Sequence, residues 1–231
     1  SIAVMLGLSV NSSLRRHRHA SAIIAVVGLA ILIGLFIGFR YLTAFDQGLI
    51  ALVQEHRSAT LDEIAVTFTL IGEFRYMLIV CSLVTGLLLL ARQWRQAIFA
   101  GGTMLLTALA NTGFKLFFAR VRPEILSEPL TSYSMPSGHA SGAFALFLSL
   151  AILAGRGQPP RLRLTWLLLG SLPALAIALS RVYLGAHWPS DIVAGAMLAA
   201  TVCAAVLWLS QRQEPLRAMS PKVWWLVLPA L

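Results

Sequence analysis

Three short polar clusters interrupt a sequence that is otherwise mainly apolar, and their residue types suit phosphate binding and proton transfer. They read KLFFARVRP at 115–123, PSGH at 136–139 and SRVYLGAHWPSD at 180–191. Lysine and arginine neutralise phosphate oxygens, and histidine exchanges protons near neutral pH. A histidine beside a carboxylate can also serve as a nucleophile. Together the clusters predict a phosphate-binding site that contains a nucleophile and a general acid.

The first cluster places two cations on one face of a helix. Lys115 and Arg122 are seven residues apart, about two helical turns. Lys115 falls inside an apolar stretch, where a charged side chain normally faces a cavity or a partner rather than lipid. Extension of its side chain to the lipid headgroups is the alternative explanation. Pro123 ends the helix and favours an extended backbone at Arg122.

The second cluster has the composition of a helix start. Pro136, Ser137 and Gly138 leave unpaired backbone N–H groups at a helix N-terminus, which attracts anions. The hydroxyl of Ser137 adds a donor, and His139 adds a group that gives or accepts a proton. The same residues would also make an ordinary helix cap, so this cluster indicates a site only in combination with the others.

The third cluster joins a cation to a histidine and a carboxylate. Arg181 has the planar guanidinium that binds phosphate through two donors. His187 and Asp191 are four residues apart, and Pro189 favours a helix that begins between them. Asp191 can then hydrogen-bond one ring nitrogen of His187 and raise the basicity of the other. A simple interaction of Asp191 with the helix dipole is the alternative explanation.

These clusters require a scaffold that brings distant segments together, and the composition predicts a membrane-embedded one. The chain has 231 residues, of which 58% are hydrophobic and 12% charged, whereas soluble domains carry about 25% charged residues. A membrane span needs about 20 apolar residues. We expect an all-α polytopic membrane protein, with short interfacial helices in 42–72 and six transmembrane helices in a bundle. The six stretches are 20–40, 74–91, 96–118, 138–154, 164–182 and 190–209.

The distribution of Lys and Arg predicts the orientation, because cytoplasmic loops are enriched in them. With the N-terminus inside, the run RRHRH at 15–19 and most other basic residues face the cytoplasm. Both termini are then cytoplasmic, and the three clusters lie at the extracytoplasmic side of the inner membrane. We expect one membrane domain over 1–231. It divides into a basic flank at 1–19, a six-helix core at 20–210 and, at 211–231, a cytoplasmic tail or the start of a further apolar segment.

The net charge of +9 does not indicate nucleic-acid binding. A nucleic-acid-binding surface gathers Lys and Arg on polar faces, whereas here short basic groups separate apolar runs. Cys81 and Cys203 lie inside apolar runs and show neither metal-ligand spacing nor a disulfide pattern. The expected partners are the lipid bilayer and a membrane lipid substrate, and the sequence leaves the oligomeric state open.

In their combination the clusters resemble the motifs of the type-2 phosphatidic acid phosphatase superfamily. That family has the pattern K-x6-RP, then PSGH, then SR-x5-H-x3-D. The chain matches it at every motif position, over residues 115–191. The matching residues are Lys115, Arg122, Pro123, Pro136, Ser137, Gly138, His139, Ser180, Arg181, His187 and Asp191.

The resemblance implies a lipid phosphatase without a cofactor or metal. It makes His187 the nucleophile that becomes a phosphohistidine, with Asp191 orienting it and His139 as general acid and base. The phosphate oxygens would be held by a set of fixed donors. These donors are Lys115, Arg122, Ser137, the backbone N–H of Gly138, and Arg181. Undecaprenyl pyrophosphate, phosphatidylglycerol phosphate, phosphatidic acid and a lipid A phosphate are the implied substrates.

Three other functions compete with this one. A metal-dependent hydrolase or phosphotransferase would use His139, His187 and Asp191 as ligands, but the neighbouring cations would repel a metal ion. A transporter or lipid scramblase normally has helices interrupted near the midplane, whereas these ionisable residues, Lys115 apart, gather at one side. A soluble haloperoxidase relative would have a similar anion site but no spanning stretches.

Overall fold

The computed structural model describes residues 2–124 and 132–231, and every regular element within them is helical, which confirms the all-α prediction. The side chains of residues 1–18 lie outside the described part, and with them most of the predicted basic flank. The elements are α1 (Ile2–Gly38), η1 (Phe39–Leu42), α2 (Thr43–Glu55), α3 (Ala59–Ile71), α4 (Phe74–Leu90), α5 (Trp94–Phe118), α6 (Gly138–Ala154), α7 (Pro160–Tyr183), α8 (Pro189–Ser210), α9 (Pro221–Val227) and η2 (Leu228–Ala230).

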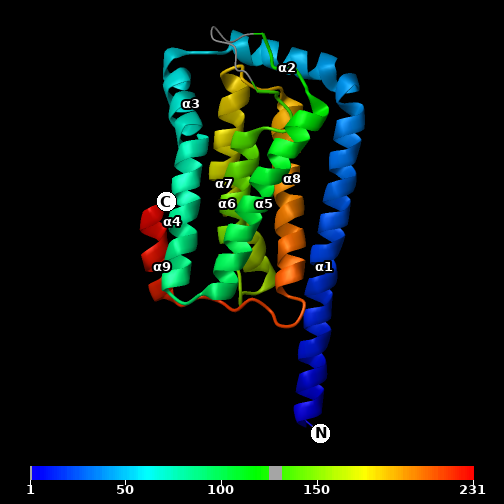
Figure 1. Ribbon diagram of the computed structural model, residues 1–231, viewed down its shortest axis with the longest axis vertical. Coiled ribbons are helices and arrows are strands. Elements are labelled where there is room, and N and C mark those ends of the chain that lie inside the picture. The colour runs from blue at the N-terminus through cyan, green and yellow to red at the C-terminus, as the bar shows by residue number, and fades with distance from the viewer. Residues whose placement is uncertain (1, 125–131) are drawn as a thin grey trace.

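The long helices form a bundle whose upper end in Figure 1 collects the three polar clusters. Helices α5 and α7 finish at this end, while α6 and α8 begin there. The first cluster therefore spans the end of α5, the second opens α6, and the third connects α7 to α8. Because α5 ends at Phe118, Lys115 and Arg122 do not share one helix face, and that prediction was wrong. Segments up to 76 residues apart in sequence, such as Lys115 and Asp191, are brought to one end by this up-and-down topology.

The prediction of six transmembrane helices is not confirmed. In the described residues, four runs are long and apolar enough to cross a membrane, and α3 with α4 makes a fifth if a bend of 50° is allowed. Helix α6 has 17 residues, about 26 Å of helix, which is less than the roughly 30 Å apolar core. The predicted stretches 74–91 and 138–154 match α4 and α6 in position, but each helix has only 17 residues, and neither qualifies as a span by itself. The four runs are His19–Glu55, Trp94–Phe118, Pro160–Tyr183 and Pro189–Ser210.

Lipid-facing side chains are recognisable on these helices by their exposure. Ile37, Leu90 and Phe117 are all more than 70% exposed, although they are large and apolar. Exposed apolar surface of this extent is uncommon on a monomeric soluble protein. In contact with lipid hydrocarbon, the same exposed side chains have no unfavourable free energy of hydration. The apolar composition and the exposed apolar side chains therefore both indicate a membrane environment.

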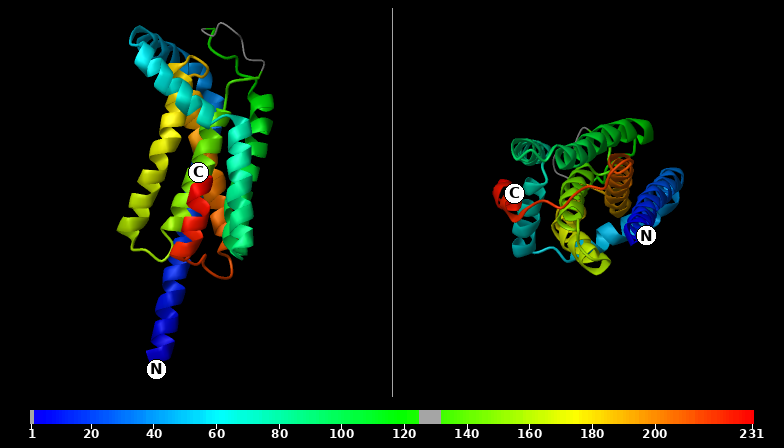
Figure 2. Two further views of the ribbon diagram at one scale, coloured as in Figure 1. Left: turned by 90° about the vertical axis from the view of Figure 1, so that its left-hand side faces the viewer. Right: turned by 90° about the horizontal axis from the view of Figure 1, so that it is seen from below.

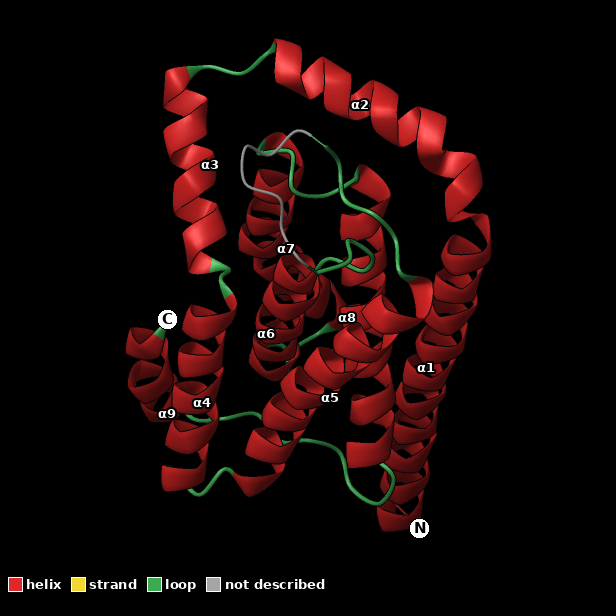
Figure 3. Ribbon diagram, turned by 45° about the horizontal axis from the view of Figure 1, so that its top comes forward, coloured by secondary structure: helices red, strands yellow, loops and turns green. Residues whose placement is uncertain are grey.

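The segment 42–72 is helical, as predicted, and it covers one end of the bundle. Helix α2 runs across the top of the bundle, and α3 descends from it toward α4 (Figure 3). The hydroxyl of Ser58 caps α3 by accepting a hydrogen bond from Leu61 N–H at 3.2 Å. Gly72 lies at the break between α3 and α4. The location of these helices at a membrane interface stays a prediction.

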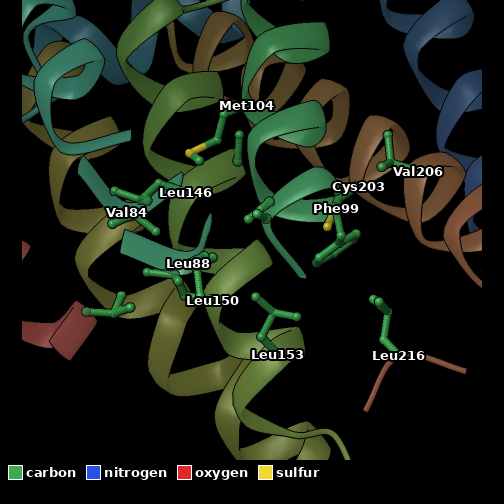
Figure 4. Packing of buried hydrophobic residues seen from close by; sticks show 14 of the residues in the cluster. Val84, Leu88, Phe99, Met104, Leu146, Leu150, Leu153, Cys203, Val206 and Leu216 are labelled. Carbon is green, nitrogen blue, oxygen red and sulfur yellow. The ribbon is translucent and has the colours of Figure 1, made fainter. Parts of the chain in front are cut away.

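The apolar core lies below the polar end, between α4, α5, α6 and α8 (Figure 4). Phe99 is fully buried at its centre, and Cys203 is buried as a small apolar residue. Helices surrounded by lipid gain little from water exclusion, so close packing holds such a core together. The labelled members are Val84, Leu88, Phe99, Met104, Leu146, Leu150, Leu153, Cys203, Val206 and Leu216.

The segment predicted as a tail or a further apolar stretch folds back on the bundle. Arg95 donates hydrogen bonds to the carbonyl oxygens of Ser210 and Glu214, both at 2.6 Å. The chain then forms α9, a helix of only seven residues that lies beside α4 (Figure 2). Its Val223 and Val227 are buried in the core.

Close contact between α6 and α8 aligns the second cluster with the third. A Cβ added to Gly195 of α8 would lie 2.7 Å from the carbonyl oxygen of Ser137 and 3.0 Å from Cβ of Ala140. The backbone N–H of Ser137 also donates to the carbonyl oxygen of Asp191 at 3.0 Å. The missing side chain of Gly195 thus lets the start of α6 lie directly against the start of α8.

Replacement of Gly195 by alanine is expected to damage both stability and the polar end. The new methyl group would push the backbone of Ser137 away from α8, a forced fit that costs about 1–3 kcal/mol. The midpoint of thermal unfolding in detergent should fall by several degrees. Gly113→Ala is the matched control, because a Cβ there meets nothing within 4 Å. Equal unfolding midpoints for the two variants would show that the α6–α8 contact is not as tight as described.

Candidate active site

His187 and Asp191 form a buried pair at the start of α8. Nδ1 of His187 lies 3.3 Å from Oδ2 of Asp191, which also accepts the backbone N–H of Trp188 at 2.8 Å. Asp191 is the third residue of α8, so its carboxylate also caps the helix. His187 is only 1% exposed and Asp191 is fully buried. The helix start therefore fixes the carboxylate that the sequence predicted would orient this histidine.

The neighbours of His187 determine which ring nitrogen carries the proton. Asp191 as a carboxylate can only accept a hydrogen bond, and Arg122 can only donate one. Nη1 of Arg122 lies 3.0 Å from Nε2 of His187. In the neutral ring the proton is therefore on Nδ1, directed at Asp191, and the lone pair is on Nε2. Nε2 is the atom that could attack an electrophile.

Burial lowers the pKa of His187 to about 4, and this is the largest of several effects. The hydrogen bond and negative charge of Asp191 raise the pKa, while Arg122 and Arg181 lower it. Burial likewise lowers the pKa of Arg122 from its usual value. The imidazole is consequently neutral, and its Nε2 lone pair available, over the whole physiological pH range.

His139 lines the same cavity as His187. Its Nε2 lies 3.2 Å from the carbonyl oxygen of Thr69 on α3. A carbonyl only accepts, so Nε2 carries a proton in this arrangement. The hydroxyls of Thr69 and Ser180 are hydrogen-bonded at 2.6 Å, which holds α3 against α7. The motif residue Ser180 thus supports the contact that orients His139.

Three predicted cations converge on the same region. Lys115, Arg122 and Arg181 are each partly buried and line one cavity with His139 and His187. Arg122 is held in place, because its Nε donates to the carbonyl oxygen of Ser132 at 2.8 Å. Arg181 keeps a buried Nε without a hydrogen-bond partner among the described residues. Such a group is available to an anionic ligand.

The two remaining predicted residues differ in their surroundings. Gly138 lines the cavity, and a Cβ at this position would lie 3.7 Å from Nζ of Lys115. Ser137 is fully buried, and its hydroxyl caps α6 by accepting Ala140 N–H at 3.2 Å. Ser137 therefore has the capping role considered as the alternative, and its contact with phosphate stays a prediction.

Sequence reasoning missed several polar residues that complete this region. Asn111 donates to the carbonyl oxygen of Pro136 at 3.2 Å and to the hydroxyl of Ser141 at 3.0 Å. It lies one helical turn before Lys115, and a polar residue on that face of an apolar helix was an available signal. Arg120 and Asp46 form buried ion pairs. No sequence motif connects these two, so only the fold could pair them.

A large cavity extends from the polar cluster into the apolar part of the bundle. Its volume is about 1440 Å³, and it is bounded by α4, α5 and α6. Its polar end contains the histidines and cations, whereas the remainder is mainly apolar and reaches Leu89 and Ala97, at the far ends of α4 and α5. A ligand that combines an anionic head with a long apolar tail matches both parts.

The metal-ligand alternative finds no assembled donor set. Among the described side chains, residues 19–124 and 132–231, no group of three or more His, Cys, Asp or Glu is arranged to hold a metal ion. His187 and Asp191 are paired, but His139 contacts the carbonyl oxygen of Thr69. The geometry favours an anion site surrounded by cations over a metal site.

Comparison with known proteins identifies the family of the chain. The model of the PAP2 superfamily matches residues 96–215, which include all three clusters and more than half of the chain. The chain belongs to the PAP2 superfamily, the family that its motifs resembled.

Individual relatives are phosphatases of membrane lipids. The chain is 31% identical to an undecaprenyl-diphosphatase of Sulfolobus acidocaldarius over 175 residues, which cover 70% of this chain and 77% of the relative. It is 28% identical to phosphatidylglycerophosphatase B of Bacillus subtilis over 150 residues, covering 60% and 70%. The crystal structure of a transmembrane PAP2-type phosphatidylglycerolphosphate phosphatase from Bacillus subtilis superimposes with a TM-score of 0.73 at 20% identity. It covers 84% of this chain and 98% of that structure.

Family, fold and apolar helices together define the class of protein. The chain is a membrane protein and a hydrolase of phosphate esters or diphosphates. A membrane lipid is the substrate type consistent with the family and with the cavity.

The pH dependence of activity should report the buried His187–Asp191 pair. Protonation of His187 would remove the Nε2 lone pair. If this atom attacks phosphorus, activity should be lost only as the pH falls toward about 4. Asp191→Asn removes the interactions that favour protonation, and the acid limb should move to still lower pH. The rate should also fall, by up to about 10⁴-fold. The measurement is kcat/KM from pH 3.5 to 8 for both proteins.

The wild type and Asp191→Asn are measured with the same substrate. Titration of the substrate phosphate therefore affects both pH profiles equally and does not contribute to the difference between them. An acid limb that stays in place, or moves to higher pH, in Asp191→Asn would contradict the assignment of that limb to His187.

Proposed function

We propose that the protein hydrolyses the phosphate or diphosphate of a long-chain membrane lipid through a phosphohistidine on His187, without a metal ion. Undecaprenyl pyrophosphate, phosphatidylglycerol phosphate and phosphatidic acid represent the substrate class. The observation that carries the proposal is the continuity of the cavity, from the cationic cluster to an apolar channel among α4, α5 and α6.

The cationic end of the cavity fits a phosphate group. Lys115, Arg122 and Arg181 neutralise its equatorial oxygens, and the backbone N–H of Gly138 adds a donor at the helix start. Donors that are fixed before the reaction stabilise the transition state without reorganisation, and removal of one typically costs several kcal/mol. Because these cations neutralise the phosphate, the mechanism needs no metal ion.

The apolar part of the cavity fits the lipid tail. From Gly72 to Leu89 the lining follows α4, a path of about 25 Å at 1.5 Å per residue. An acyl or prenyl chain in this channel holds the phosphate against the cations. Binding energy from the tail is thereby used to position the reacting group.

In the first step Nε2 of His187 attacks phosphorus as Arg122 transfers its hydrogen bond to a phosphate oxygen. The bond between phosphorus and the leaving oxygen breaks, and protonated His139 gives that oxygen a proton. Burial, Arg181 and Lys115 lower the pKa of His139 to about 3 without a ligand, and the negative charge of the bound phosphate favours its protonated form. The imidazole carries positive charge in the phosphohistidine, and Asp191 stabilises it through Nδ1–H. The dephosphorylated lipid, or the lipid monophosphate from a diphosphate, is the first product.

In the second step His139, now neutral, takes a proton from water as the water oxygen attacks phosphorus. The P–N bond breaks, its electron pair returns to Nε2, and inorganic phosphate leaves. Both histidines then have their starting protonation. Division of one displacement into two in this way is the usual advantage of covalent catalysis.

The site is proposed to face the extracytoplasmic side of the inner membrane, with both termini in the cytoplasm. The positive-inside distribution of Lys and Arg supports this orientation. Helix α2 and the three clusters lie at the end of the bundle opposite the basic loop 156–163 (Figure 1). Residues 1–231 act as a single catalytic domain in this proposal.

The phosphohistidine can be trapped directly. With a substrate labelled in its terminal phosphate, rapid acid-free denaturation should leave about one label per wild-type chain, stable to base and labile to acid. His187→Ala should retain no label and lose at least about 10³-fold in kcat, because the nucleophile is absent.

His139→Ala provides the comparison within the same experiment. It should still accept label from a substrate with a good leaving group, because only the proton donor is missing, but release phosphate slowly. Normal labelling of His187→Ala would sink the proposed role of this residue.

Length selectivity of the channel can be tested at Gly86 on α4. Gly86 lines the cavity far from the cations, and a Cβ there meets nothing within 4 Å. Phenylalanine should fill the inner part of the channel without disturbing the fold. We expect kcat/KM for a long-chain phosphatidic acid to fall roughly tenfold, which is the effect of about 1.4 kcal/mol of lost tail binding. The dihexanoyl analogue should be unaffected.

Gly113→Phe is the matched control, because Gly113 also has open space around it but lies outside the cavity. It should treat both substrates as the wild type does. If Gly86→Phe slows the two substrates equally, the channel does not hold the tail.

A further inference from the structure

Asp191 has a second, buried partner that lies on the side away from His187. Nη1 of Arg120 donates to Oδ1 of Asp191 at 2.8 Å, while Oδ2 accepts His187 Nδ1–H and Trp188 N–H. Each carboxylate oxygen is therefore committed to different donors. Rotation of the carboxylate, which would turn Oδ2 away from His187, requires the bond to Arg120 to break.

Arg120 is in turn fixed by Asp46 of α2. Nη2 of Arg120 donates to Oδ2 of Asp46 at 2.7 Å, and the backbone N–H of Ser190 donates to Oδ1 of Asp46 at 3.0 Å. The hydroxyl of Ser190 accepts from Arg120 and donates to Asp46, which closes the network. Asp46 is 0% exposed and Arg120 is 6% exposed. The carboxylate of Asp46 and both terminal nitrogens of Arg120 are thus paired with groups inside the protein.

Aromatic rings enclose the guanidinium of Arg120 as well. Its central carbon lies 5.1 Å from the centroid of the Phe39 ring and 5.6 Å from that of Trp188. Cations over aromatic faces are stabilised most when water is excluded. Ala119, which precedes Arg120, has the left-handed φ of 47° that turns the chain out of α5. The backbone and the rings together direct this side chain into the space between α2 and α8.

We propose that Asp46 and Arg120 are positioning residues, which hold Asp191 and, through it, His187 in the geometry required for attack on phosphorus. The proposal rests on the function proposed above for His187. It assigns a role in the reaction to α2, whose residues lie outside the family match at 96–215.

Charge gives Asp46 a second effect in this role. Arg120 contacts two carboxylates, so it does not fully neutralise Asp191. Without the charge of Asp46, Arg120 and Asp191 would form a neutral pair, and Asp191 would stabilise the positive imidazole of His187 less well. Asp46 therefore favours the charged state that His187 reaches during phosphoryl transfer.

Other charged or titratable groups also face His187, from every helix that borders the site. Arg122 follows α5, Arg181 ends α7 and His139 opens α6. Lys115 of α5 lines the same cavity. All of them remain in place when Asp46 is changed, so a shift in pH dependence on that change comes from the Asp46–Arg120–Asp191 connection.

The test is Asp46→Asn in the full chain, with kcat and KM measured across pH on one phosphatidic acid substrate. Asparagine keeps the shape and removes the charge. We expect kcat to fall about 10- to 100-fold, the range for lost outer support of an active-site residue, with KM within about twofold. The acid limb of kcat/KM should move to lower pH, because His187 loses a negative charge that favours its protonation.

Three further variants separate positioning from simple stabilisation. Asp46→Glu restores the charge, so its acid limb should return toward that of the wild type. Ser190→Ala keeps all charges and removes the hydroxyl that connects Arg120 to Asp46. Its kcat should therefore fall a few-fold, while the acid limb of kcat/KM stays at the wild-type pH. Asp62→Asn is the control, because Asp62 is an exposed acid that pairs with Arg57 and Tyr183 outside the network. It should keep the kcat and pH profile of the wild type.

Wild-type kcat and an unmoved limb in Asp46→Asn would overturn the proposal, as would a lowered melting temperature as the only change. If Asp46→Asn does not fold, Asp46→Glu and Ser190→Ala decide, and wild-type kcat in both overturns it. His187→Ala separates a failure of the proposed function from a failure of the positioning role. Activity that survives in His187→Ala refutes the proposed function, whereas inactive His187→Ala beside unaffected Asp46→Asn refutes only the positioning role.

Discussion

Lys115, Arg122 and Arg181 bring three positive charges into one partly buried cavity, and the mutual repulsion of those charges has to be balanced by the helices that carry them. Packing of α6 against α5, α7 and α8 supplies that balance, and the absence of a side chain at Gly195 allows the close contact of α6 with α8. An anionic ligand relieves the repulsion among the three cations. The folded protein without ligand therefore already has a site that favours the binding of phosphate. In a medium with little water such a preference is strong.

The carboxylate of Asp191 provides a negative charge beside these cations, and each of its contacts has a defined role. Asp191 caps α8, orients His187 and accepts a bond from Arg120, so a single carboxylate links helix stability to the reactivity of an imidazole. Burial alone makes the charged imidazole unfavourable, and Asp191 opposes this effect. The protein can therefore keep His187 neutral at rest and still stabilise a positive charge on its ring, as the proposed attack on phosphorus requires.

Motif spacing was sufficient to predict which residues meet, because each motif lies at a helix end and up-and-down helices bring alternate ends together. The adjacency of His187, Asp191 and Arg122 is confirmed by their contacts, and the all-helical class by the fold. The number of spans was not predictable, since hydropathy cannot tell a helix surrounded by protein, such as α6, from one that faces lipid. Asp46 was not predictable, because its partner Arg120 is 74 residues away and occupies a position that the K-x6-RP pattern leaves unspecified.

The break between α3 and α4 at Gly72 has an effect that reaches beyond chain direction. A Cβ at this residue would lie 2.4 Å from Cγ2 of Ile177 and 3.1 Å from Cδ2 of His139. The imidazole and the α7 side chain thus occupy the volume that any other amino acid would need. Any larger residue at position 72 would therefore displace Ile177 or the ring of His139, although Gly72 has no reactive group of its own. The absence of a side chain at this corner is a steric condition for the observed position of the imidazole.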